Sequence, residues 1–163
     1  MAMEFPVIAK LLEGRFPQAV KGAVTDKGDP WIEVSPGGIV EVLAFLKEEG
    51  GLEFDLLLMV TGVDRPDGEG GGEIEVVYHL ASTTQGGELV LKVRLPREKP
   101  LCPTVTGVHP GALWHERETY DMLGVEFTGH PDLRRILCPE DWVGHPLRKD
   151  YEYPEEYGGI SAK

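Results

Sequence analysis

The sequence has little cysteine, a shortage of positive charge and no long apolar run. Its 163 residues include 2 cysteines, 16 Lys and Arg, and 28 Asp and Glu, so the formal net charge is -12 at pH 7. Phosphates would repel most of such a surface, which argues against nucleic acid as a partner. No apolar segment approaches the roughly 20 residues that span a bilayer, so we expect no direct membrane insertion.

Motifs for metals and cofactors are missing as well. Cys102 and Cys138 lie far apart and form no CxxC pair, so we expect buried, reduced thiols and no zinc or iron–sulfur site. The stretch "HERET" at 115–119 has Thr119 where the zinc pattern H-E-x-x-H needs a second histidine. A stand-alone metal-dependent enzyme stays open as an alternative, with a site built by His109, His115, His130 and His145.

Several segments have the periodicity of regular elements. Apolar residues at helical spacing predict helices over 4–15, 37–49 and 110–123. Turn residues and alternation predict a hairpin over 23–34 with its turn at Lys27 to Pro30, and strands over 54–64, 73–82 and 88–96. The nearly continuous apolar run of 54–64 favours the middle of a sheet. Four alternating residues of the last strand require a cover on one face: Leu89, Leu91, Val93 and Leu95.

The fold prediction follows from these elements. We expect an α+β protein with a single domain over 1–138, in which helices pack on a mixed or antiparallel sheet. Residues 139–163 carry prolines, glycines and aromatics without a sustained period, which predicts an extended C-terminal tail.

The helix at 110–123 places charges on faces that should be apolar. At about 100° per residue, Glu116 falls in the middle of the side that contains Leu113, Tyr120 and Leu123. A carboxylate buried there needs a cation, and the leading candidates are Arg134 and Arg135.

Other charges of the stretch lie close to that carboxylate. Trp114 and Met122 bracket Glu118 in a second apolar strip, and Arg117 can pair with Asp121 four residues later. We predict one ion network, although ordinary surface pairs remain an alternative. Its members are Glu116, Arg117, Glu118, Asp121, His130, Arg134 and Arg135.

The tail combines aromatic and basic residues outside any regular element. Aromatic side chains bury a large area with little loss of rotamer freedom, which suits an arm laid along another protein. Arg148 and Lys149 could orient that arm against carboxylates of a partner. The predicted docking residues are Trp142, His145, Arg148, Lys149, Tyr151, Tyr153 and Tyr157. A tail that folds back on its own domain, or is disordered in isolation, is the alternative.

The segments "ERETYDMLGVEFTGHPDLRRIL" and "GHPLRKDY" resemble the signature of the C subunit of respiratory complex I, the NADH:quinone oxidoreductase, also called the 30-kilodalton subunit. The match is specific over about residues 110–151. The resemblance implies an α/β domain in the peripheral arm, on the cytoplasmic face of the plasma membrane. It also implies packing on the neighbouring D subunit, which helps to form the quinone site, and on other peripheral-arm subunits.

The resemblance further implies a division of labour. The chain would be a non-catalytic scaffold with no active site or cofactor of its own, while iron–sulfur clusters, FMN and quinone belong to partner subunits of the proton-translocating enzyme. The signature does not identify the electron donor. An equivalent subunit of a membrane-bound hydrogenase, or of a complex that uses ferredoxin or F420H2, is therefore an alternative.

Overall fold

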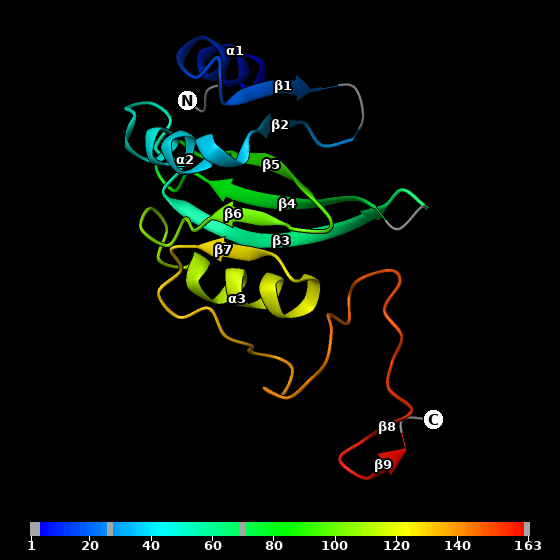
Figure 1. Ribbon diagram of the computed structural model, residues 1–163. Coiled ribbons are helices and arrows are strands. Elements are labelled where there is room, and N and C mark those ends of the chain that lie inside the picture. Colours follow the sequence, from blue (N-terminus) through cyan, green and yellow to red (C-terminus); the bar gives the residue numbers. More distant parts are fainter. Residues whose placement is uncertain (1–3, 26–27, 69–70, 162–163) are drawn as a thin grey trace.

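A five-stranded sheet forms the centre of the computed structural model, which describes residues 4–25, 28–68 and 71–161 (Figure 1). The strand order is β1-β2-β5-β4-β3. The strands are β1 (Val20–Val24), β2 (Trp31–Val34), β3 (Leu56–Pro66), β4 (Gly72–Ala81) and β5 (Glu88–Pro96). β2 and β5 are parallel, whereas the other neighbouring pairs are antiparallel. The sheet is therefore mixed, as predicted, and the α+β fold class is confirmed.

Two of the predicted strands and the hairpin lie where the alternating patterns place them. β4 and β5 correspond to the segments predicted over 73–82 and 88–96. β1 and β2 form the antiparallel hairpin, although Lys27 of its predicted turn lies outside the described residues. Alternation of apolar and polar residues is thus a reliable signal in these segments, because one face of each strand is buried.

The position predicted for the segment 54–64 is wrong. β3 lies at the edge of the sheet and, in the described ranges, pairs only with β4, while β5 occupies the centre. An apolar run in the sequence does not distinguish a central strand from an edge strand that is covered by a helix. Four large apolar side chains of β3 are in fact exposed: Leu56, Leu58, Met59 and Val63.

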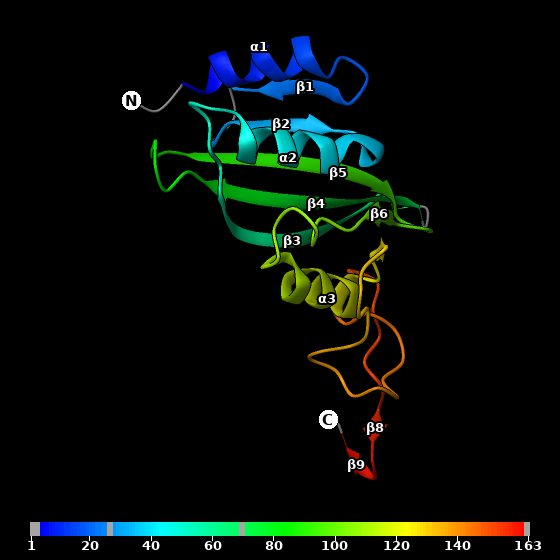
Figure 2. The same cartoon turned by 90° about the vertical axis from the view of Figure 1, so that its left-hand side faces the viewer.

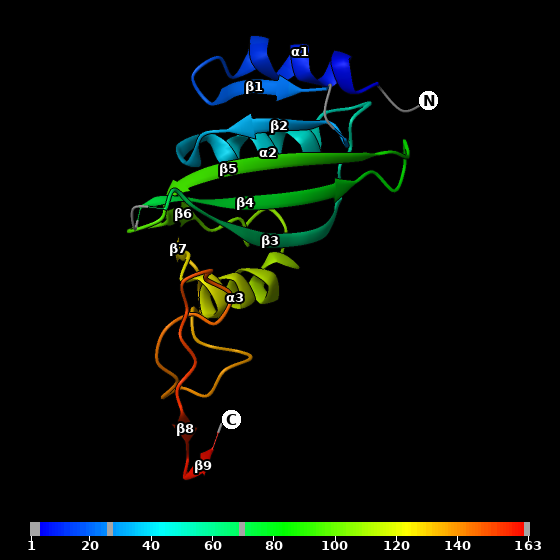
Figure 3. The same ribbon diagram turned by 90° about the vertical axis from the view of Figure 1, so that its right-hand side faces the viewer.

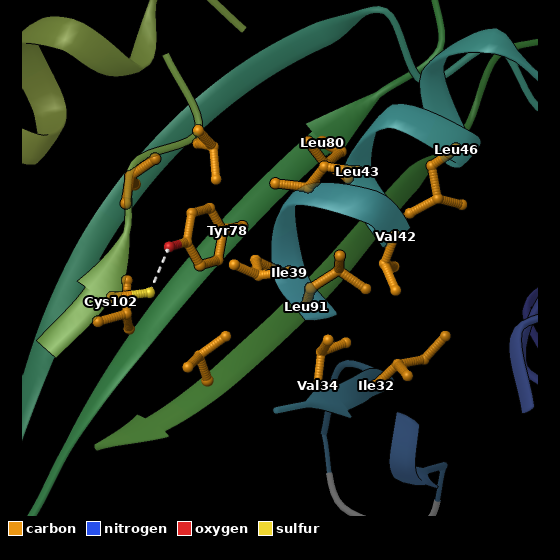
Figure 4. Packing of buried hydrophobic residues seen from close by; sticks show 14 of the residues in the cluster. Ile32, Val34, Ile39, Val42, Leu43, Leu46, Tyr78, Leu80, Leu91 and Cys102 are labelled. Atoms are coloured by element: carbon orange, nitrogen blue, oxygen red, sulfur yellow. Dashed lines mark hydrogen bonds between the residues drawn. The ribbon is translucent and has the colours of Figure 1, made fainter. Parts of the chain in front are cut away.

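The main core lies between the sheet and α2 (Ile39–Glu48), a helix preceded by one 3-10 turn, η1 (Pro36–Gly38) (Figure 2). Ile39, Val42 and Leu43 of α2 face Tyr78 and Leu91 of the sheet (Figure 4). The four residues for which a cover was predicted are each at most 1% exposed, which confirms that prediction: Leu89, Leu91, Val93 and Leu95. α1 (Phe5–Arg15) buries Ile8 and Leu12 beside β1.

The second half of the chain leaves the sheet. β6 (Leu101–Pro103) pairs in parallel with β7 (Glu126–Thr128), and α3 (Ala112–Leu123) connects them. The chain beyond residue 128 is irregular as far as β8 (Glu156–Tyr157) and β9 (Ile160–Ser161), a small hairpin that lies far from the sheet (Figure 3). Residues 162–163 of the predicted tail lie outside the described residues. Within the described ranges, no helix is long and apolar enough to cross a membrane.

Candidate functional site

The signature helix α3 lies against β3, and two glycines shape this arrangement. A side chain at Gly62 of β3 would collide with Leu123 and Thr119, so the absence of one lets the helix approach the strand closely. Gly124 ends the helix in the left-handed conformation with φ 77°, where a side chain would be strained. The chain therefore turns sharply at the point where the signature continues into β7.

Asp121, near the C-terminal end of α3, organises the segment that follows β7. Its side chain is fully buried, and its Oδ1 lies 2.6 Å from Nη1 of Arg135. Its Oδ2 accepts three backbone N–H groups, from Ile136 at 3.0 Å and from Leu137 and Cys138 at 2.8 Å each. One carboxylate thus folds a stretch of four residues around itself.

These donors decide the ionisation of Asp121. Burial alone would raise the pKa of this carboxyl group. Four hydrogen bonds act against burial: those from the backbone N–H of Cys138, from the guanidinium of Arg135 and from the N–H groups of Ile136 and Leu137. Together they outweigh it, so the pKa of Asp121 is lowered overall. Asp121 is consequently an anion whose four partners bind its charged form.

Arg117 holds the same segment from a neighbouring position on α3. Its guanidinium donates to the carbonyl oxygens of Arg134 at 3.1 Å and Arg135 at 3.0 Å, and it lies over the ring of Trp114. The predicted pair between Arg117 and Asp121 is therefore wrong. The arginine reaches across to the segment 134–135, where otherwise unpaired carbonyl groups need donors.

Glu116 is fully buried, as its helical angle predicts, but its predicted partner is wrong. The carboxylate accepts hydrogen bonds from the Thr104 hydroxyl at 2.5 Å and from the backbone N–H of Val105 at 2.8 Å. Arg135 belongs to Asp121, and Arg134 is a surface residue paired with Asp132 at 3.0 Å. Neither arginine therefore pairs with Glu116.

His130 lies close to Glu116, with its Nε2 3.9 Å from the carboxylate. That ring nitrogen is 3.1 Å from the Leu113 carbonyl oxygen, and Nδ1 accepts the backbone N–H of Asp132. Both contacts fit the neutral ring with its proton on Nε2. Burial therefore dominates and raises the pKa of Glu116 to about 7, although the Thr104 and Val105 hydrogen bonds partly oppose it.

Glu118 does not join the predicted network. The residue is exposed, and Trp114 in the same strip is 59% exposed, whereas Met122 at the other end of the strip is buried. The seven predicted residues therefore separate into different environments, with Asp121 and Arg135 in one cluster and Glu116 and His130 in another.

Residues 145–148 cap the C-terminal end of α3. His145 Nδ1 lies 3.0 Å from the carbonyl oxygen of Asp121, the N–H of Leu147 donates to Met122, and Arg148 Nε donates to Leu123 at 2.8 Å. The last carbonyl groups of a helix lack partners within the helix, and these contacts supply them. Burial lowers the pKa of His145, which suits a neutral donor at this position.

A second ion cluster, which the sequence did not reveal, fixes the next residues. Arg97 follows β5 and is 5% exposed. Its guanidinium binds Asp64 at 2.7 Å and 3.0 Å and Asp150 at 3.0 Å and 2.5 Å, while Asp64 also accepts the N–H of Lys149. These hydrogen bonds with two carboxylates raise the pKa of Arg97. Separations of 33 and 53 residues leave no local pattern by which to find the cluster.

The aromatic residues of the tail contact one another beyond this point. The ring centroids of Trp142 and Tyr157 are 5.0 Å apart, as are those of Tyr151 and Tyr153. Of the predicted docking residues, Arg148 is engaged with the carbonyl of Leu123, whereas Tyr153 is 66% exposed.

The cysteines and histidines lie apart. Cys102 is buried beside Tyr78, its Sγ 3.4 Å from the tyrosine hydroxyl, while Cys138 is half-buried, and both thiols are free (Figure 4). Burial raises the pKa of the Cys102 thiol to about 12, so it is inert at neutral pH. Among the described residues, no three or more His, Cys, Asp or Glu side chains gather as metal ligands would. The four histidines of the metal-site alternative are therefore not brought together.

Comparison with known proteins places the sequence in a family of respiratory-chain subunits. Residues 32–157 match the model of the respiratory-chain NADH dehydrogenase 30 Kd subunit family. The C subunit of the NADH-quinone oxidoreductase of Roseiflexus sp. (strain RS-1) is 45% identical over 150 residues, which are 92% of this chain and 85% of the relative. The C subunit of the Moorella thermoacetica enzyme is 45% identical over 129 residues, which are 79% of this chain and 84% of that protein.

Two solved structures share the fold. A chain of the archaeal membrane-bound sulfane sulfur reductase, a respiratory membrane complex, superposes with a TM-score of 0.67 and 29% identity, covering 90% of this chain and 85% of its own. A trypsin-resistant fragment of Nqo5 superposes with a TM-score of 0.59 and 31% identity, covering 76% of this chain and 97% of the fragment. The family match over most of the chain, together with these relatives, shows that the chain belongs to the 30-kilodalton subunit family of respiratory-chain NADH dehydrogenase, as the C subunit of the NADH-quinone oxidoreductase.

Proposed function

We propose that the chain is a non-catalytic scaffold of the peripheral arm of complex I, on the cytoplasmic face of the membrane, and that its tail docks on the D subunit. In this role the chain supports electron transfer from NADH to quinone by assembly. Iron–sulfur clusters, FMN and quinone are assigned to partner subunits of the proton-translocating enzyme, and the isolated chain is expected to bind none of them.

The distribution of apolar surface is the observation that carries the docking proposal. Six of the 13 large exposed apolar side chains of the described residues lie within the last 27 positions of the chain, and four others lie on β3. The six are Leu137, Val143, Leu147, Tyr153, Tyr157 and Ile160. Val143 is 84% and Ile160 75% exposed. Aromatic and apolar side chains that gather on an otherwise acidic protein are typical of an interface with another protein.

The inward direction of the signature charges supports a structural role. Asp121, Arg117 and Arg135 use their polar atoms to fold the segment 134–138, and the cap formed by residues 145–148 fixes the path of the tail. Such an arrangement aims the rest of the tail in one direction. It therefore lowers the ordering entropy that docking would otherwise cost.

Recovery of partners from native membranes tests this function. The tagged full chain is expected to co-purify with a homologue of the D subunit, with iron–sulfur subunits and with NADH dehydrogenase activity. The variant with Tyr153→Ser and Ile160→Ser removes two exposed apolar side chains of the tail and should recover much less of the D subunit. A matched variant with Val7→Ser and Leu11→Ser removes two exposed apolar side chains of α1 and should recover normal amounts. Equal recovery by both variants would contradict docking through the tail.

A second function is favoured by the structural match to the sulfane sulfur reductase complex, whose chain covers 90% of this one. The chain could serve as the equivalent subunit of a membrane complex that uses another electron donor, such as a membrane-bound hydrogenase. The electron donor that the recovered complex oxidises distinguishes the two functions. NADH oxidation by that complex supports the first function, whereas hydrogen or reduced ferredoxin as the donor supports the second.

A further inference from the structure

The tail contains a hollow that is separate from the contacts of Asp121, Arg117 and Glu116 described above. Two stretches of the tail, 141–144 and 151–157, line a cavity of about 360 Å³ at its surface. Its wall is aromatic, with Trp142, Tyr151 and Tyr157, and three carboxylates surround it, from Asp141, Glu152 and Glu156. No Lys or Arg is among the lining residues.

Specific contacts build this hollow. The Tyr151 hydroxyl donates to the carbonyl oxygen of Val143 at 3.1 Å, and the Tyr157 hydroxyl donates to Asp141 at 2.8 Å. Gly144 has φ 81°, and a Cβ there would lie 2.7 Å from the Tyr151 ring, so the backbone approaches the ring as only glycine allows. The two stretches are therefore held side by side by interactions at both ends of the hollow.

The chemistry of the lining selects a cation with a flat surface. Carboxylates bind a guanidinium through paired hydrogen bonds, and aromatic faces attract a cation that lies over them. Arginine combines both properties better than lysine, because its guanidinium is planar and stacks on rings. Arg148, an arginine of the tail itself, is not among the lining residues and donates instead to the Leu123 carbonyl at the end of α3.

One further polar atom points to an incomplete environment. Nε1 of Trp142, in the aromatic wall, is buried and has no hydrogen-bond partner among the described residues. The indole N–H and a guanidinium are both donors, so this atom does not select the cation and serves only as a reporter beside the hollow.

We propose that the hollow receives an arginine side chain of the protein partner that docks on the tail. The proposal rests on the scaffold function proposed above and gives the partner surface a definite chemistry, a basic one. It also reverses the charge relation expected from sequence, in which Arg148 and Lys149 would face carboxylates of the partner.

Association of the purified full chain with a purified homologue of the D subunit, measured at several salt concentrations, tests the partner surface. The variant with Glu152→Gln and Glu156→Gln should lower the association constant by about tenfold at low salt and flatten its salt dependence. The control with Glu126→Gln and Glu140→Gln changes net charge equally at exposed acids outside the hollow, and should change the constant by less than about twofold. Equal effects of both variants would overturn the proposal while leaving docking intact.

A small probe tests the hollow without the partner and so separates the two proposals. N-acetyl-arginine amide added to the full chain should shift the Trp142 indole N–H resonance, which Trp142→Phe identifies. Its neutral isostere N-acetyl-citrulline amide should not shift it. The shift should persist in the Glu126→Gln and Glu140→Gln control and be lost in the Glu152→Gln and Glu156→Gln variant. No shift with the arginine probe, or an equal shift with citrulline, overturns the proposal even if the D subunit fails to bind.

Discussion

Helix α3 buries two carboxylates, Glu116 near its middle and Asp121 near its C-terminal end, and their surroundings shift their pKa values in opposite directions. Glu116 and Asp121 are both fully buried. Asp121 has an arginine and three backbone N–H groups around it, and its pKa is lowered. Glu116 has one hydroxyl and one backbone N–H, and its pKa rises to about 7. The deeper burial of Glu116 and the larger number of donors around Asp121 together decide which acid is ionised.

The difference assigns distinct roles to the two carboxylates. The charge of Asp121 holds residues 135–138 and so fixes where the tail begins. Glu116 connects α3 with the loop after β6 through Thr104 and Val105, two hydrogen bonds that favour its charged form but are outweighed by burial. Loss of charge should thus be harmful at Asp121 and harmless or stabilising at Glu116.

Asp121→Asn should have the largest effect. The change removes the anion while leaving Arg135 and three N–H groups buried around the site, which costs on the order of 3 to 5 kcal/mol of the free energy of unfolding. Urea denaturation followed by circular dichroism measures it. The matched change Asp132→Asn, at a half-exposed acid, should cost less than about 1 kcal/mol. Similar losses for the two variants would remove the distinction on which this comparison rests.

Glu116→Gln should stabilise the protein in a pH-dependent manner. Between pH 4.5 and about 7 the unfolded chain releases the Glu116 proton while the folded chain keeps it, so the stability of the wild type falls as pH rises. Glutamine does not titrate. Its amide oxygen can accept the Val105 N–H, while its NH2 group must donate to the Thr104 hydroxyl, which reverses the direction of that hydrogen bond. The variant should match the wild type below about pH 4.5 and exceed it by up to about 3 kcal/mol above pH 7. A difference that does not change with pH would show that Glu116 titrates normally.

Arg134→Ala should have the smallest effect, although Arg134 is adjacent to Arg135. Its side chain is 63% exposed and pairs with exposed Asp132, so its removal should change the unfolding free energy by less than about 1 kcal/mol. Arg135→Ala, which leaves Asp121 without its cation, should cost several times more. Thermal unfolding of the two single variants compares them directly, and equal losses would contradict the assignment of partners.

The parts of the structure that depend on local periodicity could be predicted. The burial of Glu116 follows from its angle on the helix, and the buried face of β5 follows from alternation. The partners of Glu116 could not be predicted, because the path of the chain after β7 has no period that places Arg134 or Arg135. Glu118 was misjudged because neighbouring Trp114 is exposed, so an apolar residue marked a surface and not the core.

Long-range contacts set the remaining limits. β3 reads as a central strand because its apolar residues are numerous, yet the strand order depends on pairings that only the folded chain displays. The cluster of Arg97, Asp64 and Asp150 joins three distant segments. The signature stretch could be recognised as a unit. That Asp121 folds the following segment whereas Glu116 keeps its proton could be seen only from the contacts of each side chain.

The most direct test of the scaffold role compares the amount of assembled complex with its activity. Membranes containing Asp121→Asn or Glu116→Gln would be analysed for assembled complex I and for NADH:quinone turnover per assembled complex. We expect Asp121→Asn to lower the amount of complex and leave turnover per complex unchanged, and Glu116→Gln to leave both unchanged. A complex that assembles in normal amount with either variant but has lost turnover would contradict the account, because the carboxylate would then act in the chemistry and not in the architecture.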